Sequence, residues 1–121
     1  MLKLLAALLC VAALATPARA QTVAQTTNKS VTITTGNTFQ AVLSAVTLTA
    51  ARRSLTIQNN NATDSCWVTF GVGITAGTAA KASSILLLAG GSISRYYPYV
   101  PSDEIEATCT TTSDTLYIDV Q

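Results

Sequence analysis

The sequence contains no histidine, and only 11% of its 121 residues are charged. Without histidine the chain lacks the side chain that most often serves as a general base or as a transition-metal ligand. Catalytic arrangements of the Ser-His-Asp and Cys-His types are therefore excluded. The net charge of +1 gives no excess of Lys and Arg for contact with phosphates. We therefore expect a protein that is not an enzyme, uses no cofactor or metal and binds no nucleic acid.

Hydrophobic residues make up 49% of the chain, and many of them lie near its start. A basic start, Met1 to Lys3, precedes the apolar run Leu4–Ala15, and small residues occupy positions −3 and −1 of a cut after Ala20. This pattern is typical of a secretory signal peptide. The apolar run is too short to cross a bilayer core about 30 Å thick. We expect a signal peptide at 1–20 and one domain at 21–121, exported to the periplasm, the medium or a surface and free of the membrane after cleavage.

Removal of the signal leaves 101 residues with a net charge of −1 and one pair of cysteines, Cys66 and Cys109. In an oxidising compartment two cysteines favour a disulfide. Closure of this loop would stabilise the domain by about 4 kcal/mol in the chain-entropy account. Two thiols alone cannot form a structural zinc site, which needs four ligands. The sequence thus predicts a structural disulfide.

Short segments of alternating polar and apolar residues, separated by turn formers, fill the rest of the chain. In 66–70 the alternation places Cys66, Val68 and Phe70 on one face and turns Trp67 to the other. An unbroken apolar run, Ile85 to Leu88, predicts a buried strand that ends at the Gly90-Gly91 turn. Strands are expected at 30–35, 54–58, 66–70, 85–88, 92–97, 104–110 and 116–120, with two more within 39–49.

Short strands about ten residues apart indicate an all-β domain. The expected fold is a small antiparallel β-sandwich or jelly-roll-like domain with one disulfide. Ile105 and Cys109 fall on the inward face of their strand, as Cys66 does on its own. This agreement supports a buried bridge.

Two groups of polar residues offer weak signals for chemistry. Glu104 and Glu106 share a strand face, where they could bind calcium or act as an acid/base pair. Because no calcium-loop motif accompanies them, we favour a charged outer face that keeps the strand soluble. Lys81 with Ser83 or Ser84 could form a Ser-Lys dyad, but such residues in a polar loop are more often solvated.

The aromatic residues give the stronger candidate for binding. The segment Arg95-Tyr96-Tyr97-Pro98-Tyr99 gathers three tyrosines at one corner, and Trp67 faces outward on a strand that could lie nearby. Flat aromatic side chains suit glycan stacking or a protein interface, and they also cover sheet edges. The candidate binding surface comprises Trp67, Arg95, Tyr96, Tyr97 and Tyr99.

Three further segments resemble a known family. Arg52 to Asn59 reads R-x-x-L-x-I-x-N, Leu86 to Ser92 contains L-x-x-G-x-S, and 103–120 reads as a closing hairpin. Over 51–121 the chain is similar to small phage-encoded β-sandwich proteins. That resemblance implies a virion-surface accessory of the decoration or fibre type, with no catalytic residues.

Together these observations predict a non-catalytic exported protein that works by surface contact, with a protein partner or a second copy of itself. One alternative is an extracellular glycan-binding module that uses the aromatic residues. Another is a pilus or surface-fibre subunit that assembles through a mobile N-terminal segment, Gln21 to Ser30.

Overall fold

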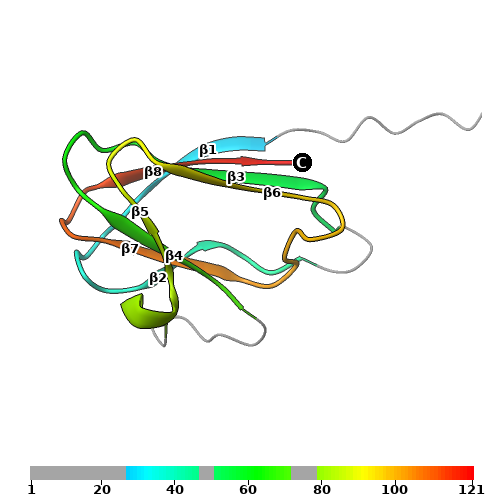
Figure 1. Ribbon diagram of the computed structural model, residues 1–121, viewed down its shortest axis with the longest axis horizontal. Coiled ribbons are helices and arrows are strands. Elements are labelled where there is room, and N and C mark those ends of the chain that lie inside the picture. The colour runs from blue at the N-terminus through cyan, green and yellow to red at the C-terminus, as the bar shows by residue number, and fades with distance from the viewer. Residues whose placement is uncertain (1–26, 47–50, 72–78) are drawn as a thin grey trace, which may run out of the picture.

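The computed structural model describes residues 27–46, 51–71 and 79–121; the predicted signal peptide lies outside them. Two four-stranded antiparallel sheets pack face to face (Figure 1). A single turn of 3-10 helix, η2, precedes the fifth strand. The strands are β1 Thr27–Thr32, β2 Gln40–Leu43, β3 Ser54–Asn59, β4 Cys66–Phe70, β5 Ile85–Leu87, β6 Ser92–Tyr96, β7 Ile105–Cys109 and β8 Thr115–Val120, and η2 is Lys81–Ser83.

The order of the strands defines the topology. One sheet has the order β1-β8-β3-β6 and the other β2-β7-β4-β5, so consecutive strands lie in different sheets except for the β4–β5 pair. This is the arrangement of an eight-stranded jelly roll built from two Greek keys. The predicted fold class is therefore confirmed.

The core lies between the sheets and follows the alternation of the sequence. On β3 Leu55 and Ile57 are buried, and they lie in register with Val120 and Ile118 of β8. Across the core, β7 contributes Ile105, Ala107 and Cys109, all fully buried. One apolar face per sheet is enough to hold two such layers together.

The apolar run at 85–88 is less buried than its sequence predicts. The strand ends at Leu87, and only Leu87 is buried, whereas Ile85, Leu86 and Leu88 are 36%, 49% and 64% exposed. The prediction of a buried strand is wrong here because β5 is the last strand of its sheet, with β4 on one side alone. An unbroken apolar run does not reveal such an edge position.

The N-terminal segment is also partly built into the fold. Thr27 to Ser30 belong to β1 and pair with β8 from Val120 to Tyr117, so a free assembly segment is wrong for these residues. Gln21 to Thr26 lie outside the described residues. Of the two strands expected within 39–49, β2 is present, and 47–49 are not described. Within the described ranges no helix has the length and apolar character to span a membrane.

Candidate functional site

The exposed tyrosine cluster (Tyr96, Tyr97 and Tyr99) forms a corner of the molecule where β6 leads toward β7. Its side chains are 64%, 77% and 81% exposed. The backbone beneath them is fixed, because the Tyr97 N–H donates to Arg53 O at 2.9 Å and the Tyr99 N–H to Tyr96 O at 2.9 Å. The corner therefore presents flat, amphipathic side chains from an ordered loop, as a contact surface requires.

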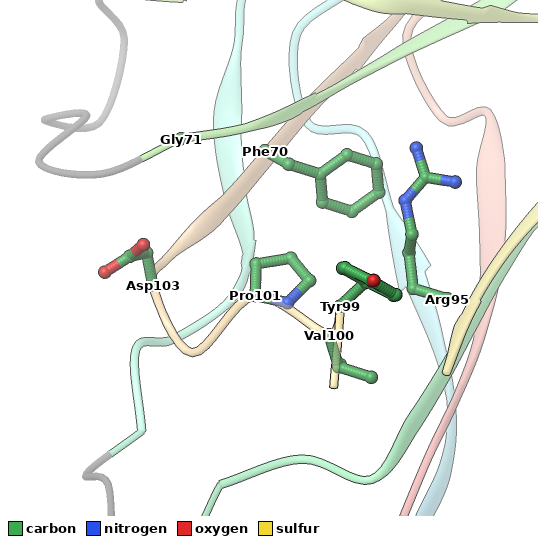
Figure 2. A pocket seen from close by; sticks show the side chains of 7 residues that line it. All are labelled: Phe70, Gly71, Arg95, Tyr99, Val100, Pro101 and Asp103. Carbon is green, nitrogen blue, oxygen red and sulfur yellow. The ribbon is translucent and has the colours of Figure 1, made fainter. Parts of the chain in front are cut away.

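A pocket of about 390 Å³ opens beside this corner, between the end of β4 and the loop before β7 (Figure 2). The Arg95 guanidinium carbon lies 5.6 Å from the centre of the Phe70 ring, a cation–π contact. Figure 2 shows Tyr99 beside Phe70 and Arg95, with the Asp103 carboxylate directed away from them. The lining residues are Phe70, Gly71, Arg95, Tyr99, Val100, Pro101 and Asp103. Two aromatic rings and one guanidinium suit a small polar ligand or a side chain of a partner.

Trp67 does not join this group. It faces outward on the other sheet, in register with Leu86 and Thr108. The Lys81 ammonium lies 3.9 Å from the centre of the indole and also donates to Asn37 Oδ1 at 2.6 Å. The structure thus places Arg95 and Tyr99 in one pocket, with Tyr96 and Tyr97 exposed nearby in the sequence. Trp67 lies outside this group, because it points away from the core while its neighbours Cys66 and Val68 point into it.

The structure shows where the candidate Lys-Ser dyad and the candidate acidic pair lie. The Ser84 hydroxyl bonds to the Thr69 hydroxyl and to Ala80 O, away from the Lys81 contacts described above.

Glu106 is completely buried on the outer face of β7, opposite Thr69, and its Oε2 accepts the Ala79 N–H at 3.3 Å. The prediction of a solvated charged face is wrong at Glu106, because its side chain is enclosed and its carboxylate accepts the Ala79 N–H.

The disulfide joins the two central strands of one sheet. Cys66 and Cys109 are direct cross-strand partners, both fully buried. The predicted bridge is confirmed. The Asp114 carboxylate lies within 4.8 Å of both sulfurs. Because the sulfurs are bonded to each other, this trio does not offer two thiolates to a metal.

Sequence reasoning missed the buried polar residues Arg52 and Asn59. The Arg52 guanidinium is 5% exposed and donates to Pro101 O at 2.6 Å, to Asp103 O at 3.0 Å and to Ser44 O. Burial lowers the pKa of Arg52, and the nearby charge of Asp103 partly opposes this. An arginine placed just before a strand gave no sign of burial in the sequence. It ties together the two loops at one end of the sandwich.

Arg52 also lines a second pocket, of about 360 Å³. Lys29 on β1 and Leu43 on β2 contribute to the same lining. Thr27, Lys29 and Gln121 in its lining are exposed, so this pocket opens at the surface beside the buried Arg52.

Comparisons with known proteins add no relative: no family model matches the chain, and no curated protein or solved structure is significantly similar to it.

Proposed function

We propose that this protein is a non-catalytic, exported structural protein that works by surface contact, as a virion-surface accessory of the decoration or fibre type. The observation that carries the proposal is the exposed tyrosine cluster. Its three aromatic side chains extend from a hydrogen-bonded backbone on the β-sandwich. Interfaces are enriched in tyrosine and depleted in charged residues at their centres. Jelly rolls recur in viral capsid domains, an analogy at the level of the fold.

The buried frame supports the same proposal. The four residues that carry the R-x-x-L-x-I-x-N resemblance are Arg52, Leu55, Ile57 and Asn59, and each is at most 5% exposed. They belong to the buried scaffold of the domain. A resemblance that includes the scaffold fits proteins that share a shape and differ in partner.

The test is the location of the protein after prophage induction in a host that encodes it. We expect mass spectrometry to find the chain in purified particles. Replacement of Tyr97 and Tyr99 by Ala should reduce its incorporation at least about tenfold, the loss of a hot-spot contact. Asn60→Ala, at the other end of β3, is the matched control and should incorporate normally. Recovery of the protein only from the medium or the envelope would overturn the virion assignment.

The pocket beside Tyr99 favours a second candidate, a glycan-binding module. Phe70 and Tyr99 offer ring surfaces and Arg95 offers hydrogen-bond donors within one opening. On a glycan array, this candidate predicts binding that Arg95→Ala and Tyr99→Ala abolish and that Trp67→Phe leaves unchanged, because Lys81 already covers the indole. The absence of any bound glycan would dismiss it.

A further inference from the structure

The exposed large apolar side chains of the described residues all lie in one stretch of chain. This stretch contains β5, β6 and the loops that follow them. Both strands are edge strands, each at the end of its own sheet. The six side chains are Ile85, Leu86, Leu88, Tyr96, Tyr97 and Tyr99. A row of exposed apolar side chains on an edge strand is a candidate contact surface.

The four edge strands differ in how they resist pairing with another chain. β1 carries a charged residue, Lys29, and its other described side chains are mostly polar. β2 has an irregular register between Ala41 and Leu43. β6 carries Arg95, whose guanidinium lies over Phe70. Charges, bulges and short edge strands are devices by which natural sheets prevent association.

β5 has neither a charge nor a bulge, and its three residues make it the shortest of the described strands. Its residues Ile85, Leu86 and Leu87 pair in unbroken register with Val68, Trp67 and Cys66 of β4. Among the described strands, only β4 pairs with it. In an antiparallel ladder, alternate residues point their backbone groups away from the partner, so an edge strand offers N–H and C=O groups to a further strand.

We infer that β5 pairs antiparallel with β5 of a second copy of this chain, which makes a two-fold dimer with one continuous sheet across both copies. This inference rests on the proposed function, a protein that works by surface contact, and names its partner. Leu86 of each copy would lie beside its symmetry mate, next to Trp67 on the outer face of the joined sheet.

A second copy is favoured over other occupants for two reasons on this surface. No residue from Ser83 to Ser94 is charged, and the Lys81 ammonium beside this edge is held against Trp67 and Asn37, so the paired strands themselves meet without like charges. The other edges of the same chain are guarded by Lys29, by the bulge of β2 and by Arg95, which disfavours a head-to-tail fibre. A self-complementary edge then closes as a two-fold pair.

The test is sedimentation equilibrium on the protein purified from an exporting host. We expect a mass of two chains. Leu86→Lys should raise the dissociation constant by about 100-fold, because each dimer carries the charge twice at its centre. Ser30→Lys, which adds the same charge to the exposed edge strand β1, is the matched control and should leave the dimer intact. Circular dichroism checks that both variants keep the sheet content of the wild type.

Amide hydrogen exchange provides the second measurement. The Leu86 amide should exchange slowly in the dimer and quickly in the Leu86→Lys monomer. A monomeric wild-type protein, or a dimer that survives Leu86→Lys and dissociates on Tyr99→Ala, would overturn the inference. The two proposals fail separately: a monomer found on virions retains the proposed function without the dimer, and a Leu86-dependent dimer absent from virions retains the dimer alone.

Discussion

Asn59 shows how a single buried amide can organise several loops. Its Nδ2 donates to the carbonyls of Asp64, Leu87 and Leu88 at 2.7 to 3.1 Å, and its Oδ1 accepts from the backbone and side chain of Asn61. The side chain thereby links the loop after β3 to the end of β5. Such a group is valuable because each buried partner would lose its hydrogen bond with it.

We expect Asn59→Ala to lower the free energy of unfolding by about 3 kcal/mol, since it strands several buried polar groups at once. Urea denaturation followed by circular dichroism measures this change. Asn60→Ala is the matched control, because Asn60 is the exposed neighbour, and it should stay within about 0.5 kcal/mol of the wild type. Equal stability of the two variants would contradict the role assigned to Asn59.

Asp64 carries a different kind of network, at the surface. Hydrogen bonds from the Thr111 and Thr110 hydroxyls to Oδ1, at 2.9 and 3.0 Å, lower the pKa of its carboxyl, with a further one from Thr63. A carboxyl whose pKa is lowered by folding stabilises the fold at pH values above the pKa of the unfolded chain, about 3.9. This contribution is lost as the pH falls through the pKa of the folded state.

An NMR titration of the side-chain carboxyl should therefore find the pKa of Asp64 below that of an aspartate in an unstructured peptide. Thr111→Val should raise it, and Asp64→Asn should remove its part of the acid dependence of stability. Ser102→Ala, in a different loop, serves as the control variant. A carboxyl that titrates at or above the peptide value would refute the threonine network.

At the scale of the strands, the β4–β7 pair forms the centre of one sheet and holds the disulfide. Cys66 and Cys109 close a loop with a sequence separation of 43. We expect the double variant Cys66→Ala, Cys109→Ala to lose about 4 kcal/mol of unfolding free energy, through the greater freedom of its unfolded chain. Urea denaturation measures the loss, and wild-type protein unfolded without reductant should show no free thiol after export. Two titratable thiols would refute the bridge.

The strands that alternate cleanly were predictable, and those at the edges were not. In 54–59 every second residue is buried, so periodicity alone locates β3. At 85–88 the sequence pattern fails, because burial there depends on whether another strand follows in the sheet. Glu106 shows the converse: its outward parity was right, yet a distant part of the chain covers it. Parity is local, whereas coverage is a property of the tertiary fold.

The candidate site divides in the same way. The members of the exposed tyrosine cluster are close together in the sequence, so the sequence alone was enough to group them. Whether an outward-facing Trp67 lies near them depends on how the two sheets are placed, and spacing carries no such information. Arg95 and Phe70 meet across the two sheets, a contact that spacing cannot predict either.

For the whole molecule, the expected signal peptide gives the most direct prediction. Protein recovered from an exporting host should begin at Gln21 by N-terminal sequencing and by intact mass, because the small residues before it suit signal peptidase. Ala20→Glu should accumulate as the uncut precursor, whereas Gln25→Glu, beyond the cut, should be processed normally. A secreted wild-type protein that still begins at Met1 would contradict the assignment.

The pairing of β1 with β8 has a consequence for the timing of folding. Thr27 lies opposite Val120, and β8 lies between β1 and β3, so the first strand has no place in its sheet until the last one arrives. Chains dominated by such distant pairings fold in about milliseconds to seconds, slowly for domains of this size. A nascent chain therefore cannot complete this sheet before β8 leaves the ribosome. That delay leaves an interval in which an unfolded polypeptide can be threaded across a membrane.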